Sequence, residues 1–251
     1  MNTSKEVKLA NTNRQAAIKE RKTKITASNL IRWAGLSAMV AGIIFAVIQP
    51  IHPPDVLASV NTRLWAIITS FKTAMSVFGL LGITGLYARH VEKTGWLGLA
   101  GYLLMSVFYA LQMCFSFTEP LILPLLATEA PKFVTGFLGI VTGSPSEVGL
   151  GALPAVYALV AVLYMLGTLL FGIAMFRARI LSRWAAGLLA FAGPLSVIMK
   201  LLGHPLDRLA AVPMGIALAW LGYALWSERR AKVSEPLTGL GSPQPVQVGA
   251  D

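Results

Sequence analysis

Charge and cysteine are what this chain has little of. Only 13% of its 251 residues are charged, and it has a single cysteine, Cys114. Soluble domains carry about 25% charged residues, so the deficit indicates a chain whose main solvent is lipid. A lone cysteine excludes an intramolecular disulfide and a zinc site built from cysteines. The apolar surroundings of Cys114 predict that it is a small packing residue.

The chain also lacks the short motifs that identify common enzyme classes. It contains no Walker loop, no GxGxxG after a strand, no GxSxG and no HExxH. It has no aspartate-rich DDxxD motif, and nothing places its serine, histidine and aspartate residues as a triad. Alternating ten-residue segments are absent as well, which argues against a membrane barrel.

Long apolar runs are what the chain has in abundance. A helix needs about 20 apolar residues to cross the hydrocarbon of a bilayer. The apolar pattern runs all round each segment, which is typical of helices embedded in lipid. We therefore predict an all-α, polytopic membrane bundle with six transmembrane helices. The runs are residues 30–49, 64–88, 96–118, 153–176, 184–203 and 209–226.

The placement of lysine and arginine predicts the orientation. If both termini are cytoplasmic, sixteen of the 21 basic residues fall in inner segments, three in outer segments and two within spans. This asymmetry follows the positive-inside rule. Most tryptophans fall at the predicted helix ends, where tryptophan prefers the membrane interface. They are Trp33, Trp96, Trp184 and Trp226 at inner ends and Trp65 at an outer end.

The remaining segments divide the chain into a core and two tails. Residues 1–29 form a basic cytoplasmic tail that can lie on anionic lipid, and a nucleic-acid role is not expected because no binding module accompanies the charge. Residues 30–226 form the transmembrane domain. Its long outer loop, 119–152, holds apolar stretches too short to span, which predicts an interfacial helix or a lid, with a re-entrant segment as the alternative. Residues 227–251 have the composition of a disordered cytoplasmic tail.

A short motif, His-Pro-x-Asp, occurs twice in a chain with only three histidines. IHPPD covers residues 51–55 and GHPLD covers 203–207, and both follow a similar helix opening at the same spacing. The repeat predicts a duplicated hairpin, and sites in membrane transport folds lie between such repeats. Two interpretations stay open. The motif is a turn that ends one helix and starts the next, or it is half of a binding site.

Further polar residues accompany the motif on the predicted outer side. They are Gln49, Lys72, Gln112, Glu119 and Lys200. A lysine inside a membrane is costly and usually faces a partner or a wet cavity, and Glu119 and Asp55 are the partners we predict for Lys72. No cofactor is evident. A divalent metal held by His52, Asp55, His204 and Asp207 is a second hypothesis, because imidazole and carboxylate ligands suit zinc and similar ions.

Several apolar motifs resemble a family of small, uncharacterised bacterial six-helix integral membrane proteins. The motifs are QPIHPPD, GLLGITGLYARH, FTEPLILPLLA, YMLGTLLFGIAMFRARILSRWAAGLLAFAGP and AWLGYALW, and the likeness covers roughly residues 30–226. The resemblance implies a multi-pass protein of the bacterial cytoplasmic (inner) membrane. It supplies no activity, substrate or catalytic residue.

Three functions are compatible with these features. We favour a non-catalytic component, transporter-like, sensory or accessory, because enzyme motifs are lacking. The first alternative is a small intramembrane enzyme, metal-dependent or not, that acts on a lipid or terpenoid at the outer leaflet. The second is a structural subunit of a membrane complex. Apart from the bilayer, no particular partner is indicated.

Overall fold

The computed structural model describes residues 26–202 and 209–234, and every regular element in these ranges is helical. The all-α prediction is therefore confirmed. The helices are α2 (Ala27–Ile51), α3 (Leu57–Val60), α4 (Arg63–Leu121), α5 (Leu123–Glu129), α6 (Pro131–Thr142), α7 (Leu153–Ala178), α8 (Arg183–Leu202) and α10 (Val212–Ser234). Both predicted tails extend less far than expected, because α2 begins before residue 30 and α10 continues past Trp226. The rest of both tails lies outside the described residues.

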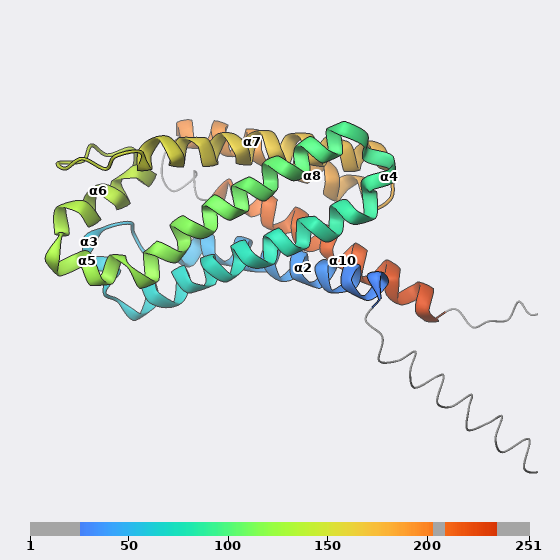
Figure 1. Ribbon diagram of the computed structural model, residues 1–251, viewed down its shortest axis with the longest axis horizontal. Coiled ribbons are helices and arrows are strands. Elements are labelled where there is room, and N and C mark those ends of the chain that lie inside the picture. The colour runs from blue at the N-terminus through green and yellow to red at the C-terminus, as the bar shows by residue number, and fades with distance from the viewer. Residues whose placement is uncertain (1–25, 203–208, 235–251) are drawn as a thin grey trace, which may run out of the picture.

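Helix α4 is two antiparallel arms joined by a single residue (Figure 1). Gly95 has φ 55° and ψ −153°, a conformation that is open to glycine and strained for other residues. The chain reverses there without a loop. The ring of Tyr87 on the first arm stacks on that of Tyr102 on the second, with centroids 4.5 Å apart. The two arms correspond to the predicted runs 64–88 and 96–118.

Glycines allow neighbouring helices to touch backbone to backbone. A Cβ added to Gly42 of α2 would lie 2.4 Å from the backbone nitrogen of Ala219 in α10. One added to Gly101 would lie 2.4 Å from the backbone nitrogen of Phe171 in α7. Small residues permit such close packing between helices in lipid.

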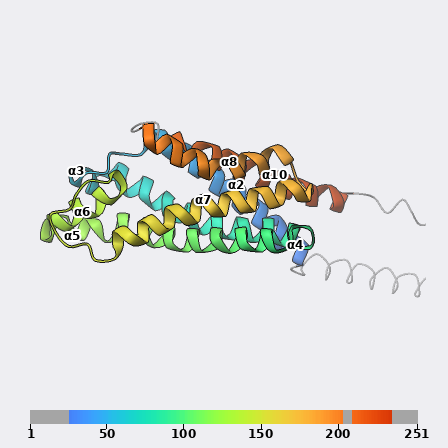
Figure 2. The same ribbon diagram turned by 90° about the horizontal axis from the view of Figure 1, so that it is seen from above.

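The long helices form a closed ring around a common core (Figures 1 and 2). Contacts join α2 to α4, α4 to α7, α7 to α8, α8 to α10, and α10 back to α2. Within the described residues the ring contains six helical segments, because α4 contributes two, and each runs antiparallel to the one before it. We call the end that carries α3, α5 and α6 the capped end, and the end at Gly95 the turn end.

The loop 119–152 forms the cap. Its two apolar stretches fold as the short helices α5 and α6, and α6 buries Val134 and Leu138 against the start of α4. Trp65 is part of this small core and is fully buried. Trp65 lies at the end of a helix as predicted, but its indole packs under the cap and not on the outer surface.

The exterior of the ring is apolar. Large side chains such as Ile43, Phe71 and Leu103 are about half exposed. Three tryptophans near the turn end, Trp33, Trp96 and Trp184, are 67%, 85% and 81% exposed. Monomeric soluble proteins rarely show apolar surface on this scale. Helices α2, α4 and α7 are long and apolar enough to cross a membrane, which is compatible with a membrane protein.

Cys114 is also exposed. The predicted small packing residue therefore does not pack in the core of the bundle. It lies on the outward face of the second arm of α4, where an apolar run faces away from the core instead of into it.

Candidate functional site

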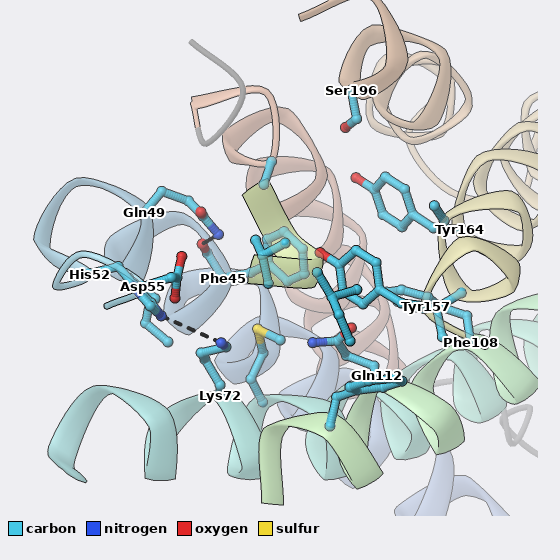
Figure 3. Close-up of a pocket in the computed structure, with 18 of the residues that line it drawn as sticks. Phe45, Gln49, His52, Asp55, Lys72, Phe108, Gln112, Tyr157, Tyr164 and Ser196 are labelled. Atoms are coloured by element: carbon cyan, nitrogen blue, oxygen red, sulfur yellow. Dashed lines mark hydrogen bonds between the residues drawn. The ribbon is translucent and has the colours of Figure 1, made fainter. Parts of the chain in front are cut away.

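A cavity of about 350 Å³ lies inside the ring at its capped end (Figure 3). Helices α2, α4, α6, α7 and α8 all contribute to its wall. Gln49, His52, Asp55 and Lys72 gather on one side, and Tyr164 and Ser196 lie on the opposite side. Of the nine residues predicted as site candidates, six line this cavity: Gln49, His52, Asp55, Lys72, Gln112 and Glu119.

Lys72 and Glu119 form an ion pair in the cavity wall. The Nζ atom of Lys72 lies 2.6 Å from Oε1 and 2.5 Å from Oε2 of Glu119. Their side chains are only 17% and 10% exposed. The pairing follows from the hairpin, since Lys72 lies 23 residues before Gly95 and Glu119 lies 24 residues after it. The predicted partnership with Glu119 is confirmed.

Besides the two oxygens of Glu119, the Lys72 ammonium also contacts the ring of His52. Its Nδ1 lies 2.7 Å from the carbonyl oxygen of Pro53, which can only accept, so Nδ1 carries a hydrogen. Its Nε2 lies 3.4 Å from Lys72 Nζ and accepts from it. A proton on Nε2 would face the ammonium, and like charges disfavour that state. The imidazole thus presents Nε2 to the ammonium as an acceptor.

The backbone around these groups is fixed by proline and tryptophan. Pro53 ends α2 at Ile51 and leaves His52 extended as its C-cap, so the first motif does end a helix. It does not cap the next one, because the N-cap of α3 is Val56 and not Asp55. The Nε1 of Trp65 donates to the backbone oxygen of Glu119 at 3.1 Å. The Trp65 ring also meets the His52 ring edge-on, with centroids 5.8 Å apart. Trp65 thus supports both sides of the polar cluster.

The two glutamines line the cavity without joining the ion pair. Gln49 donates from Nε2 to the backbone oxygen of Phe45 at 3.1 Å, one helical turn earlier. Gln112 donates from Nε2 to Oγ of Ser116 at 3.2 Å. Each hydrogen bond uses the amide nitrogen, so the amides add polarity to the wall without adding charge.

The rest of the wall is largely aromatic, which the sequence analysis did not single out. The contributing rings are Phe45, Phe108, Phe115, Phe137, Tyr157 and Tyr164. The Tyr164 hydroxyl is buried, and the structure shows no hydrogen-bond partner for it among the described residues. The Ser196 hydroxyl lies on the same side of the cavity and donates to the backbone oxygen of Ala192. Apolar periodicity alone could not separate these rings from ordinary core residues.

A second hollow, of about 460 Å³, adjoins the first beneath the loop that follows α6. Ile140, Tyr157 and Ala161 line both. These three residues therefore form the partition between the cavity and the loop region of the cap.

Only the first of the two motifs that form the predicted metal site lies within the described residues. His204 and Asp207 lie outside the described residues, and so does the side chain of Lys200. Among the residues that the structure describes, no group of three His, Cys, Asp or Glu side chains is placed to hold a metal. Both ring nitrogens of His52 are engaged by Pro53 and Lys72. Metal binding by the two motifs together stays a prediction.

Comparison with known proteins provides no relative from which a function can be transferred. No family model, no curated protein and no solved structure matches the chain. The resemblance to a family of small bacterial membrane proteins therefore stays a prediction. Function has to be argued from the cavity.

Proposed function

We propose that this chain is a multi-pass protein of the bacterial cytoplasmic membrane, with six spans and both termini in the cytoplasm. The six antiparallel segments of the ring support six crossings. Lysine and arginine are concentrated at the turn end and in the flanking tails, which the positive-inside rule assigns to the cytoplasm. The capped end and its cavity then face outward.

We further propose that the protein is a non-catalytic, transporter-like or sensory component that binds a small amphiphilic molecule in this cavity. One observation carries the proposal. The cavity has a hydrogen-bonded, charged cluster on one side and an aromatic wall on the others. Small-molecule sites are typically concave and apolar, with a few convergent polar groups that fix orientation.

The state of the polar groups favours binding over catalysis. The Lys72 ammonium is held by Glu119 and His52, so it is not poised as a nucleophile. The imidazole of His52 offers its free lone pair to Lys72 and not to the cavity. Catalytic groups in enzymes are instead tuned toward a reacting atom.

An intramembrane enzyme is the second candidate, because His52, Asp55 and Glu119 line one cavity. General acid–base chemistry on an amphiphile needs groups of these types. An enzyme would convert the bound molecule into a product, whereas a binding or transport protein would release it unchanged.

The test is to identify what the protein retains. Protein purified in mild detergent is extracted with organic solvent, and the extract is analysed by mass spectrometry. Ala161→Phe places a ring at a wall position of the cavity, whereas Val162→Phe changes a neighbouring exposed residue that does not line it. We expect one amphiphile to co-purify with the wild type and with Val162→Phe, and to be lost from Ala161→Phe.

The same molecules in all three extracts would contradict binding in the cavity. Thermal unfolding of each variant controls for misfolding. Conversion of the identified molecule by the wild type, and not by His52→Ala, would favour the enzyme.

A further inference from the structure

We propose that the ligand of this cavity is a membrane lipid, which enters sideways from the bilayer through an opening between α7 and α8 and keeps its hydrocarbon chain in that opening. This inference rests on the proposed function and names the chemical class and the entry route of the same ligand. Three observations carry it: the exposed part of the cavity wall, the divergence of α7 from α8, and the position of the polar cluster across the cavity from both.

The exposed part of the cavity wall is apolar. Among the described residues that line the cavity, the exposed ones are Val141 of α6, Ala161 of α7 and Val197 of α8. Val197 is 49% exposed, whereas Phe108 and Val160, which line the same cavity, are 5% and 4% exposed. Lining the cavity therefore does not by itself expose a residue to this degree. We call the three exposed residues the rim, because they mark where the cavity opens to the outside.

Helices α7 and α8 are in close contact beside the rim and separate at it. A Cβ added to Gly193 of α8 would lie 2.7 Å from Cα of Met165 in α7. Pro194 follows directly, and a proline inside a helix removes a backbone hydrogen bond and favours a bend. Toward the capped end the two helices diverge (Figure 2). The rim residues of α7 and α8 each lie one helical turn beyond that contact, on the side of the capped end.

The rim lies at a depth occupied by lipid chains if the helices span the membrane as proposed. Helix α7 is long and apolar enough to cross a bilayer. Ala161 follows Leu153, the first residue of α7, by eight positions, which places it about 12 Å from that end of the helix. The hydrocarbon core of a bilayer is about 30 Å thick. An opening at this depth therefore adjoins acyl chains and not water.

The polar groups of the cavity lie across from the rim. Gln49, His52 and Lys72 gather on one wall, and Ser196, the neighbour of the rim residue Val197, lies on the opposite wall (Figure 3). A lipid therefore fits with its polar end against the cluster and its first carbons between the aromatic rings. The rest of the chain passes the rim into the bilayer, where burial of apolar surface favours it.

A route from the aqueous side is the alternative, and it begins elsewhere. The second hollow lies beneath the loop that follows α6, and the exposed Ser144 is part of its lining. A water-borne ligand would pass through this hollow and across the partition formed by Ile140, Tyr157 and Ala161. The two routes can therefore be obstructed separately.

Tryptophan substitutions obstruct one route at a time. Val197→Trp places an indole on the rim, whereas Ile198→Trp changes the next residue, which is 51% exposed and does not line the cavity. Ser144→Trp obstructs the second hollow. The full-length proteins are purified in mild detergent, and their extracts are compared by mass spectrometry. We expect a chain-bearing lipid with the wild type, Ile198→Trp and Ser144→Trp, and at least fivefold less of it with Val197→Trp.

Cross-linking shows where the chain lies. Cells that express the protein are fed a fatty acid with a diazirine in its chain, which they build into their own lipids, and their membranes are irradiated before purification. We expect cross-links on Phe108 or Val160, which are buried in the cavity wall, as well as on outward residues such as Leu103. In Val197→Trp the cross-links on the buried positions should be lost and those on Leu103 retained.

Retention of the lipid by Val197→Trp, or its equal loss from Ile198→Trp, would overturn entry through the rim. An extracted molecule without a hydrocarbon chain, or wild-type cross-links on outward residues alone, would overturn the lipid. Loss from Ser144→Trp alone would assign entry to the aqueous side. Failure of the broader proposal is a different result, in which Ala161→Phe changes nothing in the extracted molecules. Cross-linking of the wild type needs no variant, so it decides the case if a substituted protein does not fold.

Discussion

At the scale of single residues, Lys72 is a largely buried charge that joins three segments of the bundle. An ammonium within an apolar helix is tolerated when a partner and hydrogen bonds compensate its lost hydration. Glu119 supplies the opposite charge and His52 supplies the third acceptor. One lysine thus ties together the end of α2 and both arms of α4.

The first prediction concerns this ion pair. Lys72→Met leaves the buried Glu119 without its counter-charge, and we expect it to lower the free energy of unfolding by about 3–5 kcal/mol. Lys72→Met combined with Glu119→Leu should recover most of that loss, because neither charge is then left unpaired. Unfolding in detergent, followed by circular dichroism, measures both changes.

An exposed ion pair provides the control for this prediction. Lys132 and Glu147 lie 3.2 Å apart in the cap, but their side chains are 71% and 75% exposed. Lys132→Met should have no measurable effect, because exposed pairs contribute little. Similar losses in Lys72→Met and Lys132→Met would contradict the view that burial makes the first pair important.

The sequence identified the polar cluster better than its surroundings. Lys72 could be matched with Glu119 because a charge in an apolar run needs a partner on the same side of the membrane. Glu119 is only 7% exposed, because the cap folds over it. Burial by a segment that is distant in sequence leaves no periodic pattern of apolar residues. The aromatic wall was missed for the same reason.

At the scale of helices, glycine positions decide which pairs can approach closely. The second prediction compares two of them. Gly42→Ala places a methyl group 2.4 Å from backbone atoms of Ala219 and Gly215, so α2 and α10 must separate, and we expect a loss of about 1–3 kcal/mol. Gly187→Ala meets only the Phe176 ring, at 3.6 Å, so it should be neutral or slightly stabilising.

Thermal unfolding of the two variants under the same detergent conditions measures this difference. Equal stability of Gly42→Ala and wild type would contradict direct backbone contact between α2 and α10. The comparison also bears on the repeat that the sequence predicts. Gly35 and Gly187 occupy equivalent positions in it. Of the two, only Gly35 lies against another helix backbone, where an added Cβ would be 3.0 Å from the oxygen of Gly222.

Helix positions were predicted well because apolar runs of about 20 residues are a strong signal. The tight reversal at Gly95 was not foreseen. Gly95, Gly98 and Gly101 recur at a spacing of three, which is typical of a packing face. Of these, Gly101 packs against α7, whereas Gly95 has nothing within 4 Å of its added Cβ and acts as a turn.

At the scale of the whole molecule, the third prediction concerns orientation. The exposed Cys114 is replaced by alanine, and single cysteines are introduced at Ser144 on the capped end and Lys93 near the turn end, both exposed. In intact spheroplasts, a membrane-impermeant maleimide should label position 144 at once. It should label position 93 only after the membrane is permeabilised.

The reverse labelling pattern would place the cavity on the cytoplasmic side and contradict the proposed topology. Equal labelling of both positions before permeabilisation would indicate that the bundle does not separate two compartments. The Cys114→Ala protein without added cysteines controls for background.

The loop-free reversal at Gly95 has a consequence for biogenesis. If the two arms of α4 cross the membrane as proposed, only the short polar segment of residues 89–95 separates them. A lysine at the centre of a lone inserting helix costs about 2.5–3.5 kcal/mol. Lys72 and Glu119 lie at almost equal distances from the turn, so insertion of the two arms as one hairpin delivers the lysine to the membrane with its counter-charge beside it. The lysine would then enter the bilayer already paired, and truncation after Thr94 should leave the first arm poorly inserted.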